Sequence, residues 1–184
     1  MEELVFKQLN SWAGWSPILD LGWEFLGVYL PYFLGLAVLA AVCCPRYFGL
    51  SGRVVPFMAL AAGLVARVVV KELFIWLAVD RLRPFAVLEI EPLWEYASSG
   101  SMPSGHTIFF FALGTVISMD NRKLGVGFLI LSVMVGVSRV VAGLHWPGDI
   151  VMGAVLGAVV GWVIFKLLRL FIIGRRLNFL QNNK

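Results

Sequence analysis

Residues 138–149 read Ser-Arg-Val-Val-Ala-Gly-Leu-His-Trp-Pro-Gly-Asp, and a long apolar segment at 149–172 continues from them. An arginine, a histidine and a carboxylate therefore stand at fixed spacing beside a predicted membrane span. Ionisable groups in or near the hydrocarbon core are expensive to bury, so their presence there indicates a function. Arg139, His145 and Asp149 are the starting point of a candidate site.

The composition indicates an integral membrane protein. Of the 184 residues, 60% are hydrophobic and 14% are charged, which is far more apolar surface than a soluble core of this size needs. About five segments are long and apolar enough to cross a bilayer, near 22–44, 54–79, 104–119, 124–139 and 149–172. We therefore predict an all-α fold, a polytopic helix bundle that forms a single domain over 1–184. Residues 1–16 mix apolar and charged side chains, and predict an amphipathic helix lying in the membrane interface.

The distribution of charge predicts the orientation of this bundle. The formal charge is +4, but the basic residues are dispersed and make no soluble face for nucleic acid, which we exclude as a partner. Short loops and a tail that are rich in lysine and arginine are predicted to be cytoplasmic. They hold Arg46, Arg53, Arg122, Lys123, Lys166, Arg169, Arg175, Arg176 and Lys184. The acidic loop at 80–102 falls on the opposite side together with the candidate site, which is predicted to face outward.

The last predicted span carries glycines at four-residue spacing, at Gly153, Gly157 and Gly161. Small residues at this spacing let two helix backbones approach closely. The pattern favours packing against another helix of the same chain over a dimer interface, and the oligomeric state stays open.

The polar residues near the spans suit the hydrolysis of a phosphate ester. That reaction needs a nucleophile, a proton donor for the leaving oxygen, and positive charge around the transferring phosphoryl group. We predict that His145 is the nucleophile and forms a phosphohistidine. Asp149 lies four residues later, which on a helix is the same face, and is predicted to orient the ring. His106, at the start of the 104–119 span, is the predicted proton donor.

The same regions supply ligands for a phosphate group. Arg83 and Arg139 offer planar guanidinium groups that bind phosphate oxygens bidentately. Ser104 offers a hydroxyl, and the backbone N–H groups from Gly105 onward open a helix N-terminus. The chain has only two histidines, without the paired spacing or the cysteines of a zinc site, so neither a metal nor another cofactor is expected.

Two of these blocks resemble a known family. Pro-Ser-Gly-His is complete at 103–106, and Ser-Arg-x5-His-x3-Asp is complete at 138–149. In both, the chain resembles the type 2 phosphatidic acid phosphatases, whose active site is shared with the vanadium haloperoxidases. The resemblance, closest in character to small bacterial undecaprenyl-diphosphatase-like members, implies a lipid phosphatase in a bacterial or archaeal plasma membrane, with its site on the outer or periplasmic side. Undecaprenyl diphosphate is the leading substrate, with phosphatidic acid, phosphatidylglycerol phosphate and lipid A phosphate as alternatives.

The first block of the family departs from its pattern in this chain. Lys-x6-Arg-Pro, anchored on Arg83, calls for lysine where the sequence has Trp76. Lys71 and Arg81 are candidates to supply the missing charge to the phosphate site, and ordinary ion pairing with neighbouring carboxylates is the alternative for both. Arg67 lies one helical turn before Lys71, and a role as partner for another helix or for a lipid headgroup explains it at least as well as contact with the substrate.

A transporter is the rival from another functional class. In it, His106, His145, Asp149 and the arginines would form a proton or anion relay. Such a relay would continue as polar residues across several spans. The cytoplasmic halves of the last three predicted spans are almost wholly apolar, which favours the enzyme.

Overall fold

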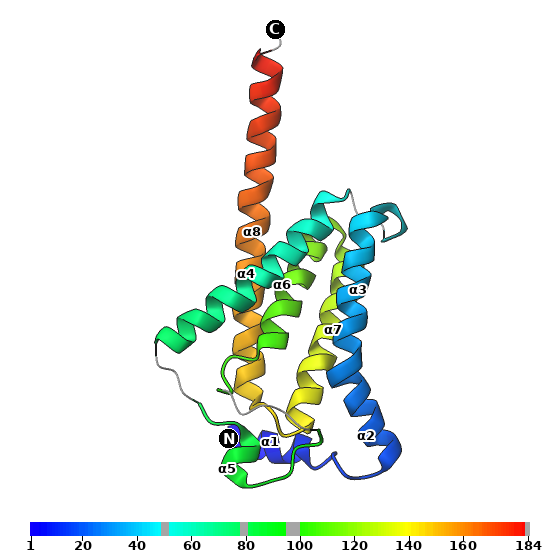
Figure 1. Ribbon diagram of the computed structural model, residues 1–184, viewed down its shortest axis with the longest axis vertical. Coiled ribbons are helices and arrows are strands. Elements are labelled where there is room, and N and C mark those ends of the chain that lie inside the picture. Colours follow the sequence, from blue (N-terminus) through cyan, green and yellow to red (C-terminus); the bar gives the residue numbers. More distant parts are fainter. Residues whose placement is uncertain (49–51, 78–80, 95–99, 183–184) are drawn as a thin grey trace.

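The computed structural model describes residues 1–48, 52–77, 81–94 and 100–182, without the side chains at 47, 48, 71, 75 and 172–182. Every element in this part of the chain is a helix, as the sequence predicts (Figure 1). The α-helices are α1 (Glu2–Asn10), α2 (Pro17–Glu24), α3 (Leu30–Cys43), α4 (Val54–Trp76), α5 (Pro84–Leu88), α6 (Gly105–Asp120), α7 (Arg122–Val141) and α8 (Pro147–Asn182). A π-helical turn, η1 (Phe25–Tyr29), joins α2 to α3, and a 3-10 turn, η2 (Pro45–Phe48), follows α3.

A helix forms at each of the predicted membrane spans, although the helix ends differ from the predicted ones. Helices long and apolar enough to cross a membrane cover Pro17–Cys43, Val54–Phe74, Arg122–Val141 and Pro147–Phe171, and α6 is a shorter apolar helix of 16 residues. The first span begins at Pro17 because Ser16 caps it, accepting the backbone N–H of Leu19 at 3.3 Å. Asn121 caps α7 in the same way, through the N–H of Leu124 at 3.1 Å, so α7 is longer than predicted.

Helix α6 lies at the centre of the bundle and contacts α4, α7 and α8. The glycines of α8 make the closest of these approaches. A Cβ added at Gly157 would lie 2.4 Å from the carbonyl oxygen of Ile108, and one at Gly161 would lie 2.6 Å from that of Ala112. The small-residue pattern is therefore explained by packing within the chain. Beyond this contact, α8 extends past the rest of the bundle (Figure 1).

Helix α1 covers the end of the bundle where α7 ends and α8 begins (Figure 1). Phe6 is fully buried, with its ring 5.1 Å from that of Trp146, and Asn10 donates a hydrogen bond to the carbonyl oxygen of Val141 at 2.8 Å. The helix predicted over 1–16 is confirmed over residues 2–10, and the chain turns over 11–15 before α2 begins. The location of this helix in a membrane interface stays a prediction.

A tight turn separates α7 from α8 and corrects one sequence-based argument. Gly143 has a φ of 80°, a left-handed conformation that glycine adopts without strain. Its carbonyl accepts the N–H of Phe85, which joins the turn to α5. Because α8 begins only at Pro147, His145 and Asp149 do not share a helical face. Their proximity comes from the turn itself.

Candidate active site

The residues of the three sequence blocks come together at one end of the bundle (Figure 1). Each lies where a helix begins or ends, and there backbone groups are left without partners inside the helix. Arg83 precedes α5, Ser104 and Gly105 begin α6 with His106 in its first turn, Arg139 lies in the last turn of α7, His145 lies in the following turn, and Asp149 lies in the first turn of α8.

The carboxylate of Asp149 is fully buried and firmly held. Its Oδ1 accepts a hydrogen bond from Arg81 Nη1 at 2.9 Å, and its Oδ2 accepts from the backbone N–H of Trp146 at 2.8 Å and from the hydroxyl of Ser101. His145 Nδ1 lies 3.5 Å from Oδ2, an ion-pair distance that is longer than a typical hydrogen bond. The carboxylate thus faces one side of the imidazole ring, and Nε2 lies on the other.

Arg83 lies against that other side of the ring. Its Nη1 is 3.2 Å from His145 Nε2 and donates to the carbonyl oxygen of Leu144 at 2.8 Å. Its Nη2 donates to the carbonyl oxygen of Gly100 at 3.3 Å. The side chain is buried, so these carbonyls hold the guanidinium rigidly beside Nε2.

The surroundings of His145 favour its neutral form. Burial lowers the pKa of the imidazole below its usual value, because a desolvated ring binds a proton less readily. The carboxylate of Asp149, which faces the ring, opposes this shift, and the nearby charge of Arg83 adds to it. A neutral ring keeps a lone pair on one nitrogen, which is what a nucleophile requires.

His106 and Arg139 form a second contact close to the first. Arg139 Nη2 lies 2.9 Å from His106 Nδ1 and 3.1 Å from Nε2, and its guanidinium lies over the ring of Trp94, 5.8 Å from the centroid. Ser104 is fully buried but does not cap α6; its hydroxyl accepts a hydrogen bond from the Thr107 hydroxyl at 3.1 Å. The first-turn N–H groups of α6 are therefore not occupied by this side chain.

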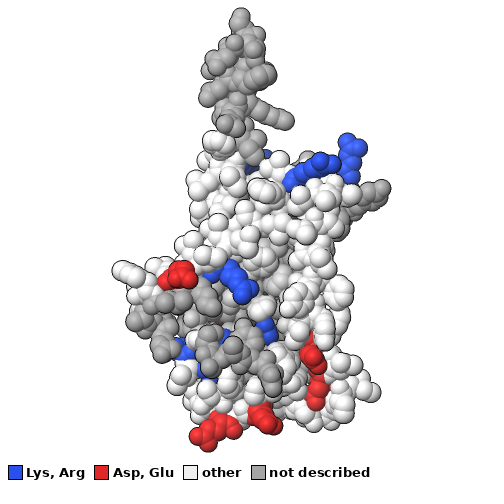
Figure 2. All heavy atoms as spheres, in the orientation of Figure 1, with Lys and Arg blue, Asp and Glu red and all other residues white. Residues whose placement is uncertain are grey.

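A cleft of about 650 Å³ opens beside His106 and Arg139. Its remaining walls come from the first span, α4, α6 and the segment before α6, and are mostly apolar. The lining residues are Gly27, Val28, Pro31, Tyr32, Leu64, Arg67, Trp94, His106, Phe109, Phe110 and Arg139. The lower half of this face carries basic side chains, with acidic ones along the bottom edge (Figure 2). The cleft has a basic end and an apolar wall, the profile of a lipid with a phosphate headgroup.

The sequence pointed to Arg81 and Lys71 as candidates to supply the charge that is missing at Trp76. Arg81 directs its guanidinium to carboxylates, through Nη1 to Asp149 at 2.9 Å and through Nη2 to Glu2 at 2.6 Å. It does not line the cleft. Trp76 ends α4 and is 80% exposed. Lys71 belongs to α4, but its side chain lies outside the described residues.

Several residues of this end were not identified from the sequence. Glu2 binds Arg81 and also accepts the backbone N–H of Gly148 at 2.8 Å, so it caps α8 from the far end of the chain. Ser101 binds Asp149, and Trp94 lies against Arg139. A carboxylate in an N-terminal helix and a serine two residues before Pro-Ser-Gly-His are weak signals, because many sequences carry them without such contacts.

Comparison with known proteins gives the family. Residues 54–172 match the PAP2 superfamily. The bacitracin transport permease protein BcrC of Bacillus licheniformis is 32% identical over 172 residues, which cover 88% of this chain and 82% of that protein. The undecaprenyl-diphosphatase BcrC of Bacillus subtilis (strain 168) is 26% identical over 179 residues, which cover 91% and 86%. The crystal structure of Aquifex aeolicus LpxE has the same fold, with a TM-score of 0.67 at 23% identity over 88% of this chain and 93% of that one. The chain is therefore an integral membrane protein and belongs to the PAP2 superfamily, whose members are phosphatases of lipid phosphate esters.

Proposed function

We propose that this chain removes the terminal phosphate of a lipid diphosphate, with undecaprenyl diphosphate as the leading substrate. One observation carries the proposal: His145 Nε2 lies beside Arg83, and the His106 and Arg139 pair lies beside a largely apolar cleft. A nucleophile, a proton donor and two guanidinium groups thus meet next to a space suited to a lipid tail.

In the first chemical step, His145 Nε2 attacks the terminal phosphorus. A bond forms between nitrogen and phosphorus, and the bond from phosphorus to the bridging oxygen breaks. Asp149 faces Nδ1 and stabilises the positive charge that develops on the ring. Arg83, Arg139, the Ser104 hydroxyl and the first-turn N–H groups of α6 stabilise the phosphoryl oxygens as their charge grows.

The leaving oxygen carries the bond electrons and takes a proton from His106. An anionic phosphate bound beside this ring favours its protonated form. In the second step, His106 accepts a proton from water, whose oxygen attacks the phosphohistidine. Inorganic phosphate leaves, and His145 returns to its neutral state. Each proton that His106 gives in the first step is recovered in the second.

The choice of a diphosphate rests on charge and on one relative. The described part of the site holds guanidinium groups from Arg83, Arg139 and Arg67 at the cleft or beside the nucleophile, and a diphosphate carries more negative charge for them to bind than a monoester phosphate does. The Bacillus subtilis relative is named an undecaprenyl-diphosphatase and is matched over nearly the whole chain. Phosphatidic acid, phosphatidylglycerol phosphate and lipid A phosphate are the alternative substrates.

We infer that the site faces the outer or periplasmic side of the membrane. Arg46, Arg53, Arg122 and Lys123 flank the opposite end of the bundle, where α3 ends and α7 begins. Basic side chains are visible at that end (Figure 2). The positive-inside rule assigns such loops to the cytoplasm, so the site at the other end lies outside.

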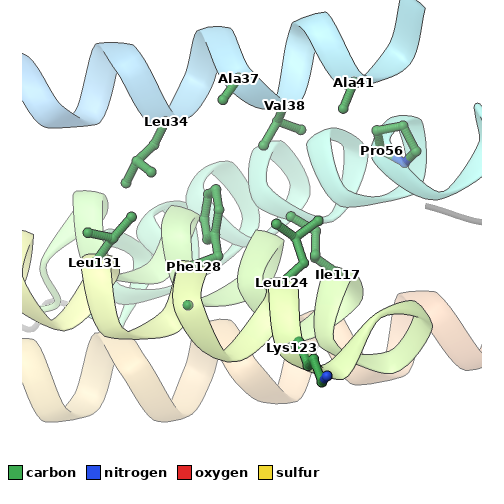
Figure 3. Close-up of a pocket in the computed structure, with 11 residues that line it drawn as sticks. Leu34, Ala37, Val38, Ala41, Pro56, Ile117, Lys123, Leu124, Phe128 and Leu131 are labelled. Atoms are coloured by element: carbon green, nitrogen blue, oxygen red, sulfur yellow. The ribbon is translucent and has the colours of Figure 1, made fainter. Parts of the chain in front are cut away.

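A second cleft bears on the transporter alternative. It has a volume of about 530 Å³, and its lining residues come from α3, α4, α6 and α7 (Figure 3). It is lined by Leu34, Ala37, Val38, Ala41, Pro56, Ile117, Lys123, Leu124, Gly127, Phe128 and Leu131. Of these lining residues, Lys123 alone is charged, and the others offer no side chain that relays a proton or an anion. The Bacillus licheniformis relative carries a transport name, but this cleft provides no proton or anion relay in the present chain.

The test is release of inorganic phosphate by the detergent-purified full chain. Undecaprenyl diphosphate, phosphatidic acid, phosphatidylglycerol phosphate and a lipid A phosphate are offered at equal concentration, with EDTA present. We expect the diphosphate to be hydrolysed fastest and His145→Asn to be inactive while its melting temperature stays near that of the wild type. No phosphate from any lipid, or normal activity in His145→Asn, would contradict the proposal.

A further inference from the structure

We infer that Arg67 binds the lipid-side phosphate of a diphosphate substrate and thereby makes the enzyme prefer diphosphates to monophosphates. This inference rests on the proposed function. It assigns a specificity role to a residue that lies outside the three sequence blocks.

Arg67 lies at the mouth of the site, on the cleft side of the reacting groups. It lines the same cleft as His106 and Arg139. A Cβ added at Gly105 would lie 3.8 Å from its Nε and 3.9 Å from its Cζ, so the guanidinium lies beside the first residue of α6. It is also within electrostatic range of the His106 ring. Its charge therefore acts where a phosphate would rest against α6.

No ion pair or hydrogen bond engages Arg67 among the residues that the structure describes. Arg81, by contrast, is bound by two carboxylates. An arginine in the middle of an apolar helix is costly unless it has a partner or faces a polar space. Since Arg67 is exposed and lines the cleft, an anionic ligand is the partner that its position fits.

The order of groups along the cleft decides which phosphate Arg67 meets. His145 does not line the cleft, and Arg83 lies against its Nε2, so the terminal phosphorus is bound on that side. Arg67 lines the cleft together with His106 and Arg139. Leu64, three residues earlier on the same face of α4, continues the wall as apolar surface. Arg67 is thus located between the reaction centre and the space for the lipid tail.

The charge that develops during the reaction explains why a cation at the position of Arg67 would matter. When the bond to the terminal phosphorus breaks, the bridging oxygen stays with the lipid and its electrons add negative charge to the departing lipid monophosphate. A guanidinium beside that phosphate stabilises the charge as it develops, which raises the rate as well as the affinity. A lipid monophosphate has no second phosphate, so its hydrolysis gains nothing from Arg67.

The experiment compares two substrates with the same tail. Farnesyl diphosphate and farnesyl monophosphate are hydrolysed by the purified full chain and by Arg67→Gln, Arg67→Lys and Arg53→Gln. Arg53 is the matched control, an exposed arginine that precedes α4 and lies away from the cleft. Phosphate release gives kcat/KM for each pair, and the melting temperature reports folding.

For Arg67→Gln we expect kcat/KM on the diphosphate to fall about 10- to 100-fold, the loss expected when a charged hydrogen bond is removed. On the monophosphate it should change by less than about threefold, and Arg67→Lys should recover part of the diphosphate rate. Should Arg67→Gln fail to fold, Arg67→Met retains the methylene packing and takes its place. Equal losses on both substrates, or none on the diphosphate, would overturn the inference. Failure of the wild type on both substrates would instead refute the proposed function, and the inference with it.

Discussion

Replacing Arg81 by glutamine removes a cation that contacts the fully buried carboxylate of Asp149. Because Arg81 sits between Asp149 and Glu2, we treat it as a positioning residue: it holds the carboxylate that faces His145 and does not itself bind phosphate. We expect Arg81→Gln to lower kcat and to leave the binding of phosphate nearly unchanged.

The magnitude follows from the burial of the two partners. Breaking a fully buried ion pair by removing one partner costs about 3–5 kcal/mol. The Arg81 side chain is 28% exposed, and Asp149 keeps the Ser101 hydroxyl and the Trp146 N–H, so the loss is reduced to about 2 kcal/mol. If all of it is lost in the transition state, kcat falls roughly 30-fold.

The assay measures kcat together with the inhibition constant of inorganic phosphate. Arg83→Gln is the comparison, because Arg83 lies beside His145 Nε2 and its loss should raise that constant. In an Asp149→Asn background, Arg81→Gln should add little further loss, since residues that act as a unit are not additive. A phosphate inhibition constant that rises as strongly in Arg81→Gln as in Arg83→Gln would refute the positioning role. So would fully multiplicative losses in the double variant.

Three further predictions concern the nucleophile and the packing. Because burial lowers the pKa of His145, the ring should stay neutral at pH values below the usual histidine pKa of about 6.5. We therefore expect kcat/KM to fall only at more acidic pH, and an acid limb of the pH profile centred above 6.5 would contradict this. Vanadate should inhibit competitively and EDTA should not, whereas activity lost to EDTA and restored by magnesium would argue for a metal-dependent reaction. Gly157→Ala should lower the free energy of unfolding by about 1–3 kcal/mol, because its Cβ meets the Ile108 carbonyl, while Gly127→Ala in open space should not; equal melting temperatures would count against the packing argument.

Local and periodic features of the chain were sufficient for the architecture. Apolar segments of membrane length predicted the spans, since a helix in lipid must satisfy its own backbone groups and so can be recognised without its neighbours. The two complete sequence blocks indicated the family, because the residues of each block lie close together in the chain and can be recognised without the rest of the fold. The glycines at Gly157 and Gly161 likewise predicted a close helix contact, which the structure forms with α6.

Contacts between distant segments were decided only by the tertiary structure. Glu2 contacts Arg81 and Gly148, which lie 79 and 146 residues away in the sequence, and no pattern in any of these segments identifies the others. Arg67 appeared in the sequence as an arginine inside an apolar helix, and only the folding of α4 against α6 brings it beside Gly105. The spacing of His145 and Asp149 suggested a helical face, but the bend at Gly143 makes their contact. Local patterns report which residues can act, whereas the packing of helices determines which of them meet.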